Sequence, residues 1–94
     1  MEKIFYRAEE NESVISVAER LNVPAVKIIG DNNLSHDIGA GDMLYIEKAE
    51  GELYNVKPWD TFLTVAKFFG RDERELREKN GNVPYIFYGM KILI

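Results

Sequence analysis

Apolar positions along this chain change between two spacings, and each spacing predicts a different kind of element. In the second half, residues 53–56 alternate as in a half-buried strand, and the apolar residues of 61–69 then recur at helical spacing. Gly70 is a natural helix stop. A second helix is predicted at 72–80 and a closing strand at 91–94. The pattern therefore predicts the order β-α-α-β.

The same order of elements occurs earlier in the chain. Shifting the sequence by 48 positions aligns Tyr6 with Tyr54 and continues to the end without a gap. Nearly every matched position is a core candidate, a capping residue or a turn glycine, so we interpret the chain as an internal duplication. By this alignment the first half contains a strand at 4–8, helices at 13–21 and 25–31, and a strand at 43–47.

We therefore expect an α+β fold of two consecutive βααβ units, each with two helices packed on a two-stranded antiparallel sheet. The first unit is predicted at residues 1–48 and the second at 52–94, with a short linker at 49–51. Units of about 45 residues are near the lower limit for folding without disulfides or metal, and the sequence has no cysteine. We expect each unit to hold a tight core and the two units to share some contact.

Composition excludes several classes of partner. The 94 residues are 46% hydrophobic and 30% charged, with a net charge of −4 and no basic cluster, so nucleic acid is not expected as a ligand. No apolar run is long enough for a signal peptide or a membrane span. The chain is expected to be cytoplasmic, associated with the spore or cell envelope, or a piece of a secreted protein.

The second half resembles the LysM (lysin motif) domain. The family pattern begins Y-x-V-x-x-G-D-T-L and continues with I-A-x-x-F, and the residues at these positions here are Tyr54, Val56, Asp60, Thr61, Phe62, Val65, Ala66 and Phe69. The first half matches the pattern more loosely. The chain is thus similar to a tandem LysM protein of bacterial type.

This resemblance implies a non-catalytic module, without cofactor, that binds glycans containing N-acetylglucosamine, either peptidoglycan or chitin-type oligomers. In the family the sugar lies in a shallow groove between the first strand–helix turn and the loop after the second helix. The expected glycan-binding residues are Pro58, Trp59, Asp60, Thr61, Phe62, Asn82, Val83, Pro84, Tyr85 and Ile86 in the second unit, and Asn11, Glu12, Ser13, Leu34, Ser35 and His36 in the first.

One departure from the family pattern affects the groove. Trp59 and Asn11 replace the glycine that precedes the acidic residue. The indole either blocks the groove or provides a stacking platform, and the alternative is that it covers the end of the core or a contact between units. Asparagine tolerates positive φ, so the turn at Asn11 in the first unit is expected to form although the glycine is replaced. His36 is the only ring in the first unit's two loops, and we expect the second unit to bind better.

Other residues of the pattern have structural interpretations. Asp60 and Glu12 are expected to be helix N-caps rather than ligands. Asn32 and Asn80 are expected to satisfy backbone groups of the loop after the second helix.

Two further expectations concern loop residues. Tyr85 is expected to face the groove while Ile86 packs inward. His36 has no partners at metal-ligand spacing, so we interpret it as a surface loop residue and expect no metal site.

Catalysis is not expected. Without cysteine, and with a single histidine, the chain offers no nucleophile–base pair, and units this small have little room for two carboxylates flanking a deep cleft. The alternative function is a protein-interaction module of a cell-wall or spore-associated complex that has lost the groove. Exposed Tyr45, Trp59, Tyr85 and Tyr88 would then bind a protein partner or a second copy. A concave groove would favour sugar, and a flat aromatic patch across both units would favour protein.

Overall fold

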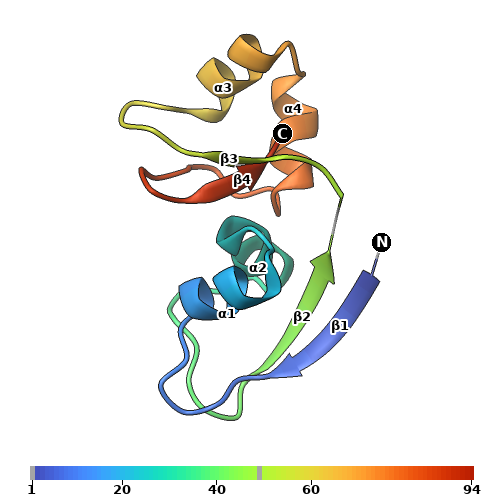
Figure 1. The fold of residues 1–94 in the computed structure, drawn as a ribbon, viewed down its shortest axis with the longest axis vertical. Coiled ribbons are helices and arrows are strands. Elements are labelled where there is room, and N and C mark those ends of the chain that lie inside the picture. The colour runs from blue at the N-terminus through green and yellow to red at the C-terminus, as the bar shows by residue number, and fades with distance from the viewer. Residues whose placement is uncertain (1, 49) are drawn as a thin grey trace.

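The chain folds into two successive βααβ units that lie one above the other (Figure 1). The computed structural model describes residues 2–48 and 50–94. Its elements are β1 (Glu2–Arg7), α1 (Val14–Leu21), α2 (Ala25–Asp31), β2 (Met43–Lys48), β3 (Leu53–Asn55), α3 (Phe62–Phe69), α4 (Glu73–Lys79) and β4 (Lys91–Leu93). We call the half from β1 to β2 the first unit and the half from β3 to β4 the second unit. The expected α+β class, with a two-stranded antiparallel sheet in each half, is confirmed.

The proposed boundaries remain predictions. The first unit, 1–48, and the linker, 49–51, each include one residue outside the described part of the chain.

Each sheet pairs the first and last strand of its own unit. β1 lies antiparallel to β2, and β3 lies antiparallel to β4 with Tyr54 opposite Ile92. Alternation along β2 buries Leu44 and Ile46 while Met43 remains exposed, because successive side chains of a strand point to opposite faces of the sheet. One face of each sheet is therefore apolar and is covered by the helices of its unit.

The first helix of each unit begins at a hydroxyl residue. Ser13 and Thr61 are the N-caps of α1 and α3, and each side chain accepts a hydrogen bond from the amide three residues further on. The prediction that Glu12 and Asp60 are the N-caps is wrong, because both carboxylates turn back towards the preceding strand. Gly70 ends α3 in the left-handed conformation, at φ 66°, as expected of a helix stop.

Asn32 and Asn80 connect the second helix of each unit to the last strand. The Asn80 side chain donates to the carbonyls of Leu76 and Leu93 and accepts from the amide of Leu93, at 2.7–2.8 Å. Asn32 makes the same three bonds in the first unit. The prediction that these asparagines satisfy the following loop is wrong. The strand has an edge with free backbone groups, and the asparagine amide matches their spacing.

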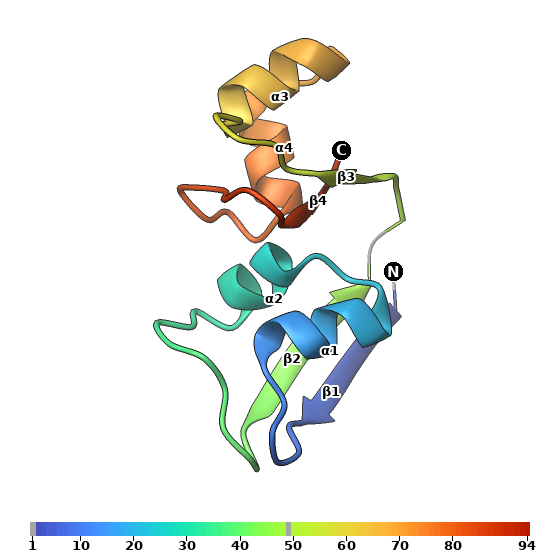
Figure 2. The ribbon, with the colours of Figure 1, turned by 60° about the vertical axis from the view of Figure 1, so that its left-hand side comes forward.

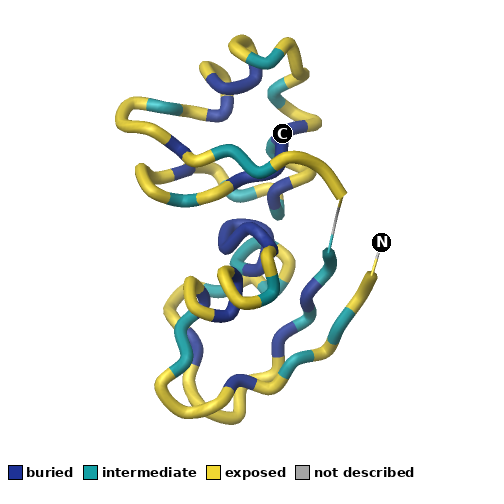
Figure 3. The backbone as a smooth tube through the Cα atoms, viewed as in Figure 1, coloured by how far each residue is buried: buried dark blue, intermediate teal, exposed yellow. Residues whose placement is uncertain are grey.

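The two units pack directly against each other through α2 (Figure 2), with β4 as its neighbour in the second unit. Ala25 and Ile28 belong to the core of the first unit, whereas Val26 is buried in the core of the second. Gly30 lies against Gly81, so closely that a Cβ atom on Gly30 would overlap the Gly81 carbonyl. The buried colouring of α2 beneath the second unit shows this contact (Figure 3). The expectation that the units share packing is confirmed.

Candidate functional site

The turn between β3 and α3 is held by a tyrosine and a carboxylate. Asp60 accepts a hydrogen bond from the Tyr54 hydroxyl at 2.6 Å and another from the Lys57 amide at 2.8 Å. The tyrosine bond, and then the amide bond, lowers the pKa of Asp60, and the same pairing raises the pKa of Tyr54. The carboxylate thus fixes the turn by joining it to the strand.

The first unit contains the same device with one addition. Glu12 accepts from the Tyr6 hydroxyl at 2.7 Å and from the Glu9 amide at 2.7 Å, and the Arg20 guanidinium lies 2.6 Å from it. The tyrosine bond is the main cause that lowers the pKa of Glu12, followed by the Glu9 amide. The internal alignment matches Tyr6 with Tyr54 and Glu12 with Asp60. It does not show that each tyrosine bonds to the carboxylate six positions further on, because that contact depends on how the turn folds.

The residue before each carboxylate has a left-handed backbone. Asn11 has φ 65° and Trp59 has φ 74°. Asparagine tolerates this region, as expected, but a bulky aromatic residue there is strained. The Trp59 side chain is 95% exposed, so the interpretation that it covers a core or an inter-unit contact is wrong.

The loop between α4 and β4 presents aromatic rings to solvent. Tyr85, Phe87 and Tyr88 are 64–75% exposed, whereas Ile86 is buried in the core of the second unit. The expected opposite orientation of Tyr85 and Ile86 is therefore observed. In two views this loop and the β3–α3 turn project on the same side of the second unit (Figures 1 and 2).

In the second unit, several of the predicted glycan-binding side chains are buried or already hydrogen-bonded within the unit. Phe62 is 2% exposed and Ile86 is 8% exposed, so both are core residues that offer only their backbone. Thr61 is occupied as the N-cap of α3, and Asp60 is bonded to Tyr54. The exposed predicted residues of this unit are Pro58, Trp59, Thr61, Asn82, Pro84 and Tyr85.

In the first unit, the predicted loop after α2 does meet the start of α1. A hollow, which we call the first-unit hollow, is lined by Val14, Ile15, Ile29, Leu34, Ser35, His36 and Asp37. Asp37 accepts hydrogen bonds from the amides of Val14 and Ile38, at 2.9 and 2.8 Å, and so closes the loop onto the helix. The predicted residues Asn11, Glu12 and Ser13 do not line this hollow.

Sequence reasoning missed Ile15 and Ile29, and it missed the hydrogen bonds by which Asp37 closes the loop onto α1. Ile15 carries a signal, because it is an apolar residue of α1 outside the buried face that Val14, Val17 and Ala18 form. The roles of Ile29 and Asp37 depend on how the loop folds back, and no spacing indicates that.

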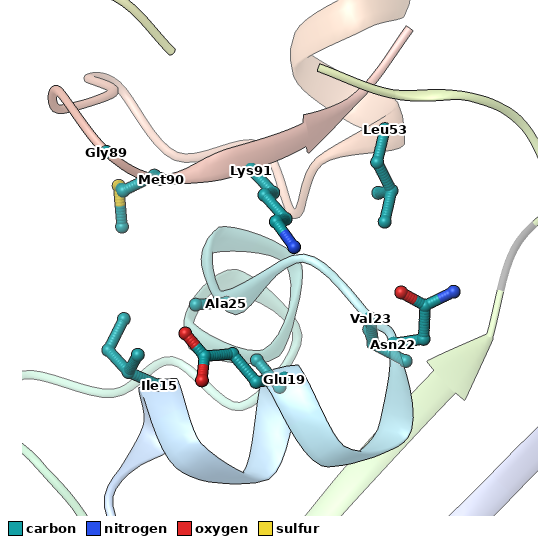
Figure 4. Close-up of a pocket in the computed structure, with 10 residues that line it drawn as sticks. Ile15, Glu19, Asn22, Val23, Ala25, Leu53, Gly89, Met90 and Lys91 are labelled. Carbon is teal, nitrogen blue, oxygen red and sulfur yellow. The ribbon is translucent and has the colours of Figure 1, made fainter. Parts of the chain in front are cut away.

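Two further hollows lie where the units meet. The inter-unit hollow is lined by Val26, Ile29, Val83, Pro84, Tyr85, Phe87 and Met90, which are all apolar or aromatic. The junction cleft is lined by Ile15, Ala18, Glu19, Asn22, Val23, Ala25, Leu53, Gly89, Met90 and Lys91. Figure 4 shows Glu19 and Lys91 extending into this cleft from α1 and β4. The predicted loop residues Val83, Pro84 and Tyr85 thus face the first unit as well as solvent.

Residues 2–48 and 50–94 contain no group of three histidine or carboxylate side chains arranged to hold a metal ion. His36 is exposed, and one ring nitrogen lies 2.9 Å from the carbonyl of Asp37. None of the helices in the described ranges is long and apolar enough to cross a membrane.

Comparison with known proteins finds similarity only among solved structures. No family model matches the chain, and no curated protein matches its sequence. The chain is similar to the spore cortex-lytic enzyme SleL of Bacillus megaterium QM B1551, with 26% identity and a TM-score of 0.49 over 96% of this chain and 22% of that one. It is also similar to SleL of Bacillus cereus, with 19% identity and a TM-score of 0.48 over 100% of this chain and 23% of that one. The chain spans less than a quarter of the length of either enzyme chain.

Proposed function

We propose that this chain is a non-catalytic tandem LysM module that binds glycans containing N-acetylglucosamine, with the second unit as the stronger site. Trp59 carries the proposal. Its left-handed backbone costs about 1–3 kcal/mol for a residue that is not glycine. Its side chain is 95% exposed, so no packing within the chain offsets that cost. A ligand-binding role accounts for an indole held in this position.

The surroundings of Trp59 suit a sugar. Pyranose rings have apolar C–H faces that stack on aromatic rings. Tyr85 is exposed in the α4–β4 loop, and this loop projects on the same side of the unit as the β3–α3 turn (Figures 1 and 2). The hydrogen bonds that Asp60 accepts from Tyr54 and Lys57 hold the turn in one conformation. A site with a fixed backbone loses less entropy when it binds.

The state of the two turn carboxylates argues against hydrolysis at this site. A glycosidase needs one carboxylic acid whose pKa is raised so that it can donate a proton to the leaving group. The pKa values of Asp60 and Glu12 are both lowered, and their oxygens accept hydrogen bonds from tyrosine and backbone groups. Their role in our proposal is to shape the turns.

The decisive experiment replaces Trp59 by glycine. Trp59→Gly removes the ring and relieves the strain, so we expect stability to urea to rise by about 1 kcal/mol or more. Affinity for the N-acetylglucosamine pentamer is expected to fall roughly three- to tenfold, in line with the value of one aromatic contact. Calorimetric titration and NMR shifts measure the binding.

Phe68→Ala is the matched control, because Phe68 is an exposed aromatic residue in the last turn of α3, at the opposite end of the helix from the β3–α3 turn. It is expected to leave binding unchanged. Unchanged affinity in Trp59→Gly, or no saturable binding by the wild-type chain, would contradict the proposed site.

The alternative function is a protein-interaction module of a cell-wall or spore-associated complex. The inter-unit hollow favours it, because a lining without charged side chains also suits an apolar side chain of a partner protein. Tyr45 contributes less than expected to such a surface, since it is half-buried and its hydroxyl donates to Glu47 at 2.8 Å. This alternative would be favoured if the wild-type protein formed a homodimer in light scattering and bound no N-acetylglucosamine oligomer.

A further inference from the structure

The first-unit hollow, the inter-unit hollow and the junction cleft share lining residues with one another. Ile29 lines both the first-unit hollow and the inter-unit hollow. Ile15 lines both the first-unit hollow and the junction cleft, and Met90 lines both the junction cleft and the inter-unit hollow. The three hollows are therefore neighbours, and together they extend from the loop after α2, across the boundary between the units, to the loop after α4. We call the surface that they form the depression.

The relative position of the units along this depression is fixed by backbone contact. A Cβ atom on Gly81 would lie 2.7 Å from the carbonyl oxygen of Val26, and the Gly30 contact is tighter still. Val26 is also buried in the core of the second unit. The two ends of the depression are thus held in register by α2.

The lining has the two-sided chemistry that an amphipathic chain requires. Tyr85 and Phe87 provide exposed aromatic surface at one end, and Ile29 provides an aliphatic surface in the middle. Ser35 and His36 provide polar groups at the other end. A β-linked glycan strand presents apolar ring faces to such a floor and hydroxyl and acetamido groups to its rim.

We propose that one extended glycan strand binds across both units along this depression, so that α2 of the first unit is part of the binding surface of the second. The inference rests on the proposed function and goes beyond it, because Trp59 does not line any of these three hollows. The preferred ligand is a polymer strand long enough to cross the junction, and the two units act as one composite site.

The test compares the N-acetylglucosamine dimer with the hexamer by calorimetry on the full chain. We expect the hexamer to bind at least tenfold more tightly, with one hexamer per chain. Tyr85→Ala and His36→Ala change exposed residues at opposite ends, so both are expected to fold. Each of the two substitutions should weaken binding of the hexamer at least threefold, whereas at most one of them should weaken binding of the sugar dimer. Phe68→Ala, outside all three hollows, should affect neither.

Methyl NMR provides a second readout at the junction itself. Binding of the hexamer is expected to shift the methyl signals of Ile15, Ile29 and Met90 together. Equal affinity for dimer and hexamer, or two bound oligomers per chain with unshifted junction methyls, would overturn the composite site and leave the proposed function standing. Absence of binding by any oligomer would overturn both.

Discussion

At the scale of single residues, the same hydrogen bond occurs in both units between a strand tyrosine and a turn carboxylate. The pairs are Tyr6 with Glu12 and Tyr54 with Asp60. Each carboxylate also accepts a backbone amide of its own turn. These bonds, rather than helix capping, explain why an acidic residue precedes the hydroxyl N-cap in both halves of the chain.

This arrangement predicts how stability depends on pH. The folded pKa values of Glu12 and Asp60 lie below the unfolded values, which are near 4, so the unfolded chain binds more protons in acid. Their stabilising contribution is complete above the unfolded pKa and is lost as the pH falls through the folded pKa. Asp60→Asn and Glu12→Gln should be less stable than wild type at pH 7 and lose less stability between about pH 5 and pH 2. Thermal unfolding over this range measures the difference.

Glu10→Gln is the matched control, because Glu10 is an exposed carboxylate in the turn before Glu12. Its melting temperature is expected to follow the wild-type pH profile. If Asp60→Asn also followed that profile, the tyrosine bond would not be the source of the acid sensitivity.

At the scale of elements, the sequence predicts most of what the structure contains. The change from alternating to helical spacing locates all eight elements, and the internal alignment extends the clearer second half to the first. The partners of Asn32 and Asn80 were not predictable in the same way. A spacing shows which residues share a face of one element, but these bonds join a helix end to a strand 13 positions further along.

The asparagine bridge predicts a large loss of stability in Asn80→Ala. The side chain is fully buried, and its removal leaves the amide and carbonyl of Leu93 and the carbonyl of Leu76 without this partner. We expect a loss of about 2–4 kcal/mol in urea unfolding. Asn32→Ala should cost less, because Asn32 is only half-buried and water can replace part of its bonding. Asn55→Ala, at an exposed strand position, is the control. If Asn55→Ala lost as much stability in urea as Asn80→Ala, this account would be contradicted.

At the scale of the whole molecule, the arrangement of the two units determines what the candidate site becomes. The sequence predicts shared packing only from the small size of each unit. It does not show that α2 enters the second core or that the loop after α4 lies against the first unit. The local pattern of α2 is satisfied by its own unit, so its second contact becomes visible only in three dimensions.

Gly30→Ala tests this arrangement, because helix propensity and packing predict opposite signs. In a free helix, alanine is favoured over glycine by up to about 1 kcal/mol. At position 30 the added methyl group would overlap the backbone of Gly81, and overpacking of this kind costs about 1–3 kcal/mol. We therefore expect Gly30→Ala to be destabilised in urea and to shift NMR signals of the α4–β4 loop, more than 50 positions away in sequence. Gly39→Ala should be neutral by comparison, because the nearest atom to its Cβ position is 4.0 Å away. A stabilised Gly30→Ala with an unperturbed second unit would mean that the units do not pack in solution, and the composite site would then lose its physical basis.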